Sequence, residues 1–202
     1  MIQPDNDDVR DRAARVIASG GVIAFKTDTF YGLGADPLNP IAVRRIFELK
    51  GREEGKPILV LISDLDQVDN FIADADSYKA IATKYWPAAL TLVSSAHSEL
   101  PCELTAGTDS IGLRLPDNDS VRDFVRACGG ALTATSANLS GQPPARTAVE
   151  VQEYFPMAID LIVDAGSVSA MEPSTVIDLT TTPARLIREG AVPREQLKGI
   201  LG

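Results

Sequence analysis

Three cationic side chains lie within seven residues of one another in a predicted loop: Lys50, Arg52 and Lys56. Cations gathered in this way can neutralise a triphosphate, and an arginine can hold a phosphate through two parallel hydrogen bonds. Glu53 and Glu54 lie in the same loop and could pair with these cations at a solvated surface. From spacing alone, both interpretations stay open.

The segment 51–56 has part of the pattern of a phosphate-binding P-loop. However, its two glycines are one residue too close together, and Pro57 follows Lys56 where the P-loop has Ser or Thr. No predicted strand directly precedes Gly51. A Walker A loop is therefore excluded, and what remains is a cluster of cations between a helix and a strand.

A second group of polar residues follows the predicted strand at 131–134. Ser136, Asn138 and Ser140 offer hydroxyl and amide groups that can donate to and accept from a polar ligand. The same residue types also cap helices. Two prolines at 143–144 argue against a helix that starts directly after Ser140, so the binding interpretation stays open beside the capping one.

The segment 27–34 follows the predicted strand at 22–25 and contains Thr27, Thr29 and two glycines. Hydroxyls and glycines let a ligand approach backbone N–H groups closely. On this segment alone, an ordinary strand-to-helix loop is the preferred interpretation.

Arginines end or follow three strand-like runs, at Arg114, Arg146 and Arg188. A strand-terminal arginine is usually a surface ion pair. Two of them, Arg114 and Arg188, are on strands that flank the other candidate sites, which favours a shared anion-binding cleft. His97 is the only histidine and lies in a polar loop, where we expect it to be exposed, so a Ser-His-Asp hydrolase is excluded.

The composition is that of a folded, acidic protein. The chain has 202 residues, of which 45% are hydrophobic, and a net charge of −9. That charge argues against broad nucleic-acid binding, which needs a basic surface. No apolar run approaches the ~20 residues that span a bilayer, and the first residues lack the apolar region of a signal peptide.

Cys102 and Cys128 match no metal or redox spacing and are interpreted as reduced core residues. We expect a cytoplasmic protein with no membrane association.

Helices and strands alternate along the chain, with strands concentrated in its C-terminal half. This order predicts one α/β domain over 1–202, with a mixed sheet. The expected helices cover 9–19, 41–49, 77–86, 121–128, 147–154 and 193–201. The expected strands cover 22–25, 58–62, 90–93, 111–115, 131–134, 161–163, 175–179 and 185–188.

Five motifs in this order resemble the YrdC-type family of threonylcarbamoyl-AMP synthases. They are the turn 27–33, the Lys-x-Arg loop at 50–57, the Ser-x-Asn-x-Ser-Gly turn at 136–141, and the segments 173–178 and 186–190. The resemblance covers about 20–192. The chain is similar to the short members of the family, without the additional C-terminal domain of the long ones. Lys26, Glu53 and the pair Ala88-Ala89 depart from the family's usual residues, which affects loop geometry more than reaction class.

The resemblance implies a twisted mixed β-sheet flanked by helices, with a large concave cavity lined by positive charge. It also implies that L-threonine, bicarbonate and ATP react to give L-threonylcarbamoyladenylate and pyrophosphate, with Mg²⁺ on the ATP phosphates and no protein metal site. A tRNA threonylcarbamoyl transferase complex would be the partner, with tRNA itself as a further candidate ligand.

The same resemblance assigns roles by position. Threonine would contact Thr29, Arg114, Ser136 and Ser174. ATP would contact Arg52, Lys56, Ser110, Asn138, Arg146 and Arg188. Lys50 and Arg52 would act catalytically at the phosphate end.

Two alternatives from other classes remain. One is an RNA-binding or ribosome-maturation module, against which the charge of −9 argues. The other is a carbamoyl-adenylate-forming domain of the kind found in hydrogenase-maturation proteins, which usually lies in a much longer chain.

Overall fold

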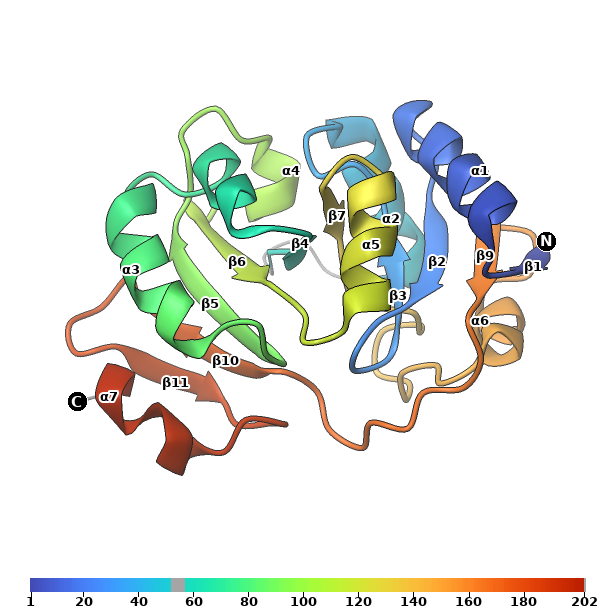
Figure 1. Ribbon diagram of the computed structural model, residues 1–202. Helices are drawn as coiled ribbons and strands as arrows, with labels where there is room; N and C mark the ends of the chain where they lie inside the picture. The colour runs from blue at the N-terminus through green and yellow to red at the C-terminus, as the bar shows by residue number, and fades with distance from the viewer. Residues whose placement is uncertain (52–56, 202) are drawn as a thin grey trace.

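The computed structural model describes residues 1–51 and 57–201 (Figure 1). The strands are β1 (Ile2–Pro4), β2 (Ile23–Lys26), β3 (Tyr31–Gly34), β4 (Val60–Ile62), β5 (Leu90–Ser95), β6 (Ser110–Arg114), β7 (Ala131–Thr133), β8 (Thr135–Ser136), β9 (Leu161–Asp164), β10 (Thr175–Asp178) and β11 (Arg185–Arg188). The α-helices are α1 (Asp7–Ala18), α2 (Pro40–Lys50), α3 (Ala75–Tyr85), α4 (Cys102–Thr105), α5 (Asp119–Ala127), α6 (Ala148–Tyr154) and α7 (Lys198–Leu201), with 3₁₀ helices η1 (Leu65–Asn70) and η2 (Arg194–Leu197).

The mixed α/β fold expected from the sequence is confirmed, but the strands form two sheets and not one. The first has the order β1-β9-β2-β3-β8, and the second has the order β11-β10-β5-β6-β4-β7. Each sheet contains both parallel and antiparallel pairs: β2 is parallel to β9 and antiparallel to β3, while β5 is parallel to β10 and antiparallel to β6. The chain passes from the second sheet to the first between β7 and β8, across the single residue Ala134.

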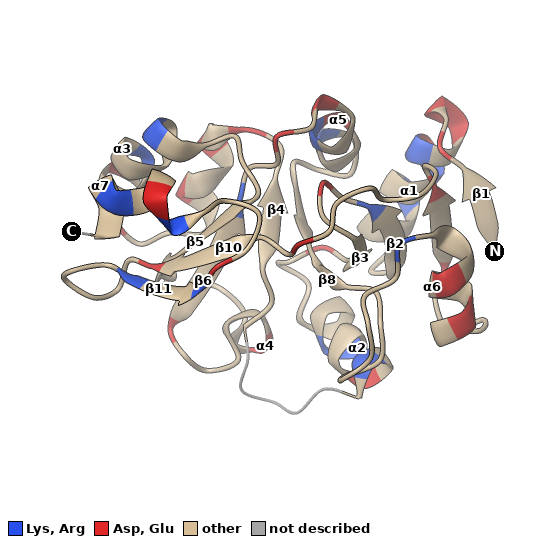
Figure 2. Ribbon diagram, turned by 90° about the horizontal axis from the view of Figure 1, so that it is seen from below, with Lys and Arg blue, Asp and Glu red and all other residues tan. Residues whose placement is uncertain are grey.

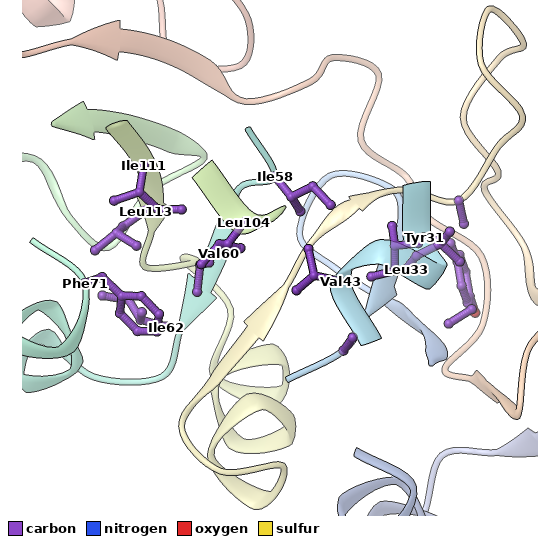
Figure 3. Packing of buried hydrophobic residues seen from close by; sticks show 14 of the residues in the cluster. Tyr31, Leu33, Val43, Ile58, Val60, Ile62, Phe71, Leu104, Ile111 and Leu113 are labelled. Atoms are coloured by element: carbon purple, nitrogen blue, oxygen red, sulfur yellow. The ribbon is translucent and has the colours of Figure 1, made fainter. Parts of the chain in front are cut away.

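Both faces of the central strands are buried, which explains their continuous apolar sequence. In β4, Val60 and Ile62 face one hydrophobic cluster while Leu61 faces another. This alternation follows from the two-residue period of a strand. The larger cluster contains residues of both sheets and of α2, so the sheets share one core (Figure 3). The smaller cluster lies against α1 and α5, where Phe25 stacks on Phe124 with ring centroids 5.2 Å apart.

Polar side chains cap the starts of four helices, each within two residues of the expected start. Asn39 accepts hydrogen bonds from the backbone N–H groups of Ile41 and Ala42, and Pro40 occupies the first turn of α2. Asn6, Asn118 and Thr147 cap α1, α5 and α6 in the same way. Each cap satisfies N–H groups that have no partner inside the helix.

Among the described residues, five short elements were absent from the sequence-based prediction: β1, β3, β8, η1 and α4. Strand β1 is held by parallel pairing with β9, from Ile2 opposite Ile162 to Pro4 opposite Asp164. Its partner lies about 160 residues away along the chain. A local pattern cannot reveal such a pairing, since the stabilising contacts are all non-local.

The segment 27–34 is a β-hairpin, so the expected strand-to-helix loop is wrong. Strand β3 pairs antiparallel with β2, from Ile23 opposite Gly34 to Lys26 opposite Tyr31. Gly34 is required by packing, because a Cβ atom there would lie 2.7 Å from Cε1 of Phe25. The two glycines therefore belong to a buried strand, and Gly34 makes room for an aromatic ring.

One of the two cysteine predictions is also wrong. Cys128 is a buried core residue, and burial raises the pKa of its thiol to about 12. Cys102 is exposed at the first turn of α4, with its Sγ beside Glu103. Both are free thiols. Within residues 1–51 and 57–201, no helix has the length and apolar character needed to cross a bilayer.

Gly34→Ala should destabilise the protein by about 1–3 kcal/mol, because the new methyl group overpacks the Phe25 ring. Gly32→Ala in the same strand is the matched control, since its Cβ would meet its nearest neighbour at an ordinary 3.4 Å. Urea unfolding of both variants measures the difference. Equal stability of the two variants would contradict the packing role of Gly34.

Candidate functional site

A cavity of about 550 Å³ lies between the hairpin of the first sheet and the strand ends of the second. The hairpin contributes Thr27, Thr29 and Phe30, and the loop after β8 contributes Asn138 and Gln142. From the second sheet come Arg114 at the end of β6 and Arg188 at the end of β11, with Pro173 and Ser174 before β10. Polar groups thus converge from both sheets on one hollow, as in many small-molecule sites.

A second cavity of about 590 Å³ lies against β5, β6, β10 and β11 and includes Ser110 and Asp178. The two cavities share four lining residues: Pro57, Leu59, Ser174 and Arg188. Each volume is within the range of about 300–1,000 Å³ that small ligands occupy. Two adjoining cavities suit two ligands that must meet.

Arg114 is the buried cation of the first cavity, with a side chain only 3% exposed. Its Nη2 atom lies 3.0 Å from Oδ1 of Asp28, and its Nη1 donates to Oγ1 of Thr29 at 3.4 Å. Burial lowers the pKa of Arg114, the Asp28 carboxylate raises it, and the positive charge of Arg188 lowers it further. A buried guanidinium of this kind is costly without an anion beside it.

Asp28 was not among the residues singled out from the sequence, although it lies between Thr27 and Thr29. Burial raises the pKa of its carboxyl group, while attraction to Arg114 lowers it. The sequence signal for Asp28 is a charged residue shortly after a buried strand. Its pairing with the strand-terminal Arg114 is visible only in the structure.

Thr27 shapes the turn in which Asp28 and Thr29 lie. Its Oγ1 donates to the carbonyl of Phe30 at 2.7 Å and accepts from the backbone N–H groups of Thr29 and Phe30, both at 3.2 Å. Oγ1 of Thr29 lies 3.2 Å from Oγ1 of Thr27. The turn is therefore held by its own hydroxyls, with Thr29 at the cavity wall.

Ser174 and Arg188 meet at the edge that the two cavities share. The carbonyl of Ser174 accepts from Nη2 and Nε of Arg188 at 2.9 and 3.2 Å. Oγ of Ser174 lies 3.0 Å from Oγ1 of Thr91 in β5. Burial lowers the pKa of Arg188. The second cation is thus fixed by a backbone carbonyl, which leaves its charge without a counter-ion in these contacts.

Comparisons with known proteins agree with this arrangement. The model of the family Sua5_yciO_yrdC, described as "Telomere recombination", matches residues 15–190. The chain belongs to this family. A threonylcarbamoyl-AMP synthase of Pyrococcus abyssi is 36% identical over 94% of this chain and 56% of the relative, and one of Bacillus subtilis is 34% identical over 98% and 58%. The chain therefore spans a little over half the length of these curated relatives.

A solved structure with the same fold is the P. abyssi Sua5 protein complexed with L-threonine. It superimposes with a TM-score of 0.92 at 33% identity, over all of this chain and 60% of the other. The similarity to YrdC-type proteins expected from the sequence is confirmed.

The structure brings most of the candidate residues to the two cavities. Thr29, Arg114, Ser136, Asn138, Ser174 and Arg188 line the first, and Ser110 lines the second. Arg52 and Lys56 lie outside the described residues, and their roles stay predictions. Arg146 is not among the described residues that line either cavity. Its Nη2 donates to the carbonyl of Val168 at 3.1 Å, and its guanidinium touches Met171.

Lys50 is buried at the end of α2, where it holds the loop after β8. Its Nζ donates to the carbonyls of Ser136 and Asn138 and to Oδ1 of Asn138. The amide of Asn138 in turn donates to the carbonyls of Leu139 and Gln142. Asn138 thus helps to hold the turn in which it lies, and the phosphate role of Lys50 stays a prediction.

The charged residues are spread over the outer helices, and those of α6, Glu150 and Glu153, are both acidic (Figure 2). Within residues 1–51 and 57–201, no three His, Cys, Asp or Glu side chains are grouped so that they could hold a metal ion. The arginines among the described lining residues, Arg114, Arg185 and Arg188, are the groups suited to an anionic ligand.

Lys50→Met should lower the free energy of unfolding by about 1–3 kcal/mol, because buried carbonyl acceptors lose their donor. Lys79→Met is the control, since Lys79 forms a surface ion pair with Asp69 that contributes little. Denaturant unfolding measures both. A Lys50→Met protein as stable as the wild type would show that the loop does not depend on this side chain.

Proposed function

We propose that this protein forms L-threonylcarbamoyladenylate and pyrophosphate from L-threonine, bicarbonate and ATP. The observation that carries the proposal is the pair of adjoining cavities, with Arg114 buried in one and Arg188 between the two. The curated relatives named threonylcarbamoyl-AMP synthase, and the threonine complex of the P. abyssi protein, support it.

Threonine is assigned to the first cavity. Its carboxylate pairs with the guanidinium of Arg114, a planar group that can offer two parallel hydrogen bonds. Hydroxyls of Thr29, Ser136 and Ser174 surround the same space and suit its amine and hydroxyl groups.

ATP is assigned to the region around the second cavity and the shared edge. Among the described residues, the proposed contacts are Ser110 in the second cavity, Arg188 at the shared edge, Asn138 in the first cavity, and Arg146, which is not among the described lining residues of either cavity. Arg52 and Lys56 are proposed for the phosphates, with Lys50 near them and Mg²⁺ carried by the nucleotide.

The reaction needs no protein nucleophile. The threonine amine and bicarbonate form a carbamate with loss of water, and a carbamate oxygen attacks the α-phosphate while the bond to the β-phosphate breaks. Pyrophosphate leaves with the electron pair of that bond. The protein contributes positioning, cations beside the developing charge and shelter for an unstable carbamate.

The product is proposed to pass to a tRNA threonylcarbamoyl transferase complex in the cytoplasm, which transfers the group to an adenosine next to the anticodon. An RNA-binding module without chemistry is disfavoured by the charge of −9 and by polar groups that converge on a cavity of small-molecule size.

Pyrophosphate release from ATP should require both threonine and bicarbonate, since the attacking oxygen exists only after both have combined. A coupled phosphate assay with each substrate omitted in turn measures this. Release that continues at the same rate without threonine would refute the proposed function and would indicate an unrelated ATPase.

Arg114→Lys should raise the threonine dissociation constant about 10-fold to 100-fold, because a lysine cannot reproduce two parallel hydrogen bonds. ATP affinity, measured alone by calorimetry, should change little. Arg126→Lys serves as the control, since Arg126 forms exposed ion pairs with Asp64 and Asp123. Normal threonine affinity in a folded Arg114→Lys protein would place the carboxylate elsewhere.

A further inference from the structure

The Asp28–Arg114 pair is the least satisfied buried contact of the site. Within residues 1–51 and 57–201, three buried side-chain atoms lack a hydrogen-bond partner, and they are both carboxylate oxygens of Asp28 and Nε of Arg114. Nη2 of Arg114 nevertheless lies 3.0 Å from Oδ1 of Asp28. The two charged groups are thus in contact, but the Asp28 oxygen does not lie along an N–H bond of the guanidinium. The pair is therefore ionic without a well-formed hydrogen bond.

Most buried ion pairs are completed by hydrogen bonds, because two desolvated charges need them to offset the loss of water. When an ion pair at a cavity wall lacks these hydrogen bonds, some N–H groups of its guanidinium stay available to a ligand. In this protein, Nη1 of Arg114 reaches Thr29, which lines the cavity, at a long 3.4 Å. The guanidinium can therefore exchange a weak contact for a strong one with a bound anion.

The charges nearby explain why the buried Arg114 needs a carboxylate in contact with it. Arg188 is the other cation of the cavity, and its charge acts unfavourably on Arg114. Asp28 is the carboxylate in contact with Arg114, and its side chain is only 9% exposed. It is not among the described residues that line the cavity, whereas its partner Arg114 is.

We infer that Asp28 is the positioning residue for the amino-acid carboxylate: it holds the guanidinium of Arg114 in place against Arg188 and leaves donors of that guanidinium for the ligand. The inference rests on the proposed function, since it takes the ligand of Arg114 to be the carboxylate of threonine. Asp28 makes no contact with the ligand and acts only through the arginine.

The test compares Asp28→Asn, which removes the charge with little change in shape, with the wild-type protein. The threonine dissociation constant, measured by calorimetry, should rise about 10-fold to 100-fold, because a buried cation loses its partner and its position. The ATP dissociation constant should stay within about twofold. Asp160→Asn is the control, since Asp160 pairs with Arg45 on the outside of the protein.

A second variant keeps the test decisive if Asp28→Asn does not fold. Asp28→Glu retains the charge but displaces the carboxylate by one methylene, so threonine affinity should fall by less than in the Asn variant and ATP affinity should be unchanged. Unchanged threonine affinity in a folded Asp28 variant would overturn the inference, as would equal weakening of threonine and ATP.

These outcomes are separate from failure of the proposed function. If the wild-type protein binds no threonine and releases no pyrophosphate, the function is wrong. If the wild type does both while Asp28→Asn behaves in the same way, the function stands and the positioning role is wrong.

Discussion

The arrangement of the molecule depends on one short segment, 131–136, which belongs to both sheets. Its first part, β7, pairs with β4, and its second part, β8, pairs with β3. Between them the backbone N–H of Ala134 donates to the carbonyl of Leu59 at 2.7 Å, while Oγ1 of Thr133 accepts from the N–H of Ala35 at 2.8 Å. Because these bonds tie both sheets to one strand, the hairpin of the first sheet faces the strand ends of the second across a cavity.

That cavity is where the fold tolerates incomplete interactions. Elsewhere, central strands such as β4 are covered on both faces by apolar side chains. At the cavity, the side chains of Arg114 and Asp28 are buried beside the hydroxyls of Thr29 and Ser174. Natural proteins accept such costs at functional sites and offset them by well-packed surroundings.

Much of this could be predicted from the sequence, because the signals were local. The helix expected at 41–49 is α2, and the strand expected at 58–62 contains β4. The resemblance to the family, which rests on ordered motifs, also led to the residues that line the cavities. These were signals that a chain carries within a few residues.

The rest depended on distant contacts. The pairing of β1 with β9, the division into two sheets and the ion pair of Asp28 with Arg114 each join residues far apart in the sequence. The hairpin at 27–34 was missed because its glycines resemble loop glycines, whereas Gly34 is needed to accommodate Phe25. Periodicity does not show which aromatic ring a glycine will face.

The shared edge of the two cavities has a thermodynamic consequence. Ser174 and Arg188 line both, and Arg188 is held by the carbonyl of Ser174. A ligand that binds Arg188 in one cavity changes the charge and the hydrogen-bond donors available to a ligand in the other cavity. The two binding equilibria are then linked, and by reciprocity each ligand alters the affinity of the other by the same factor.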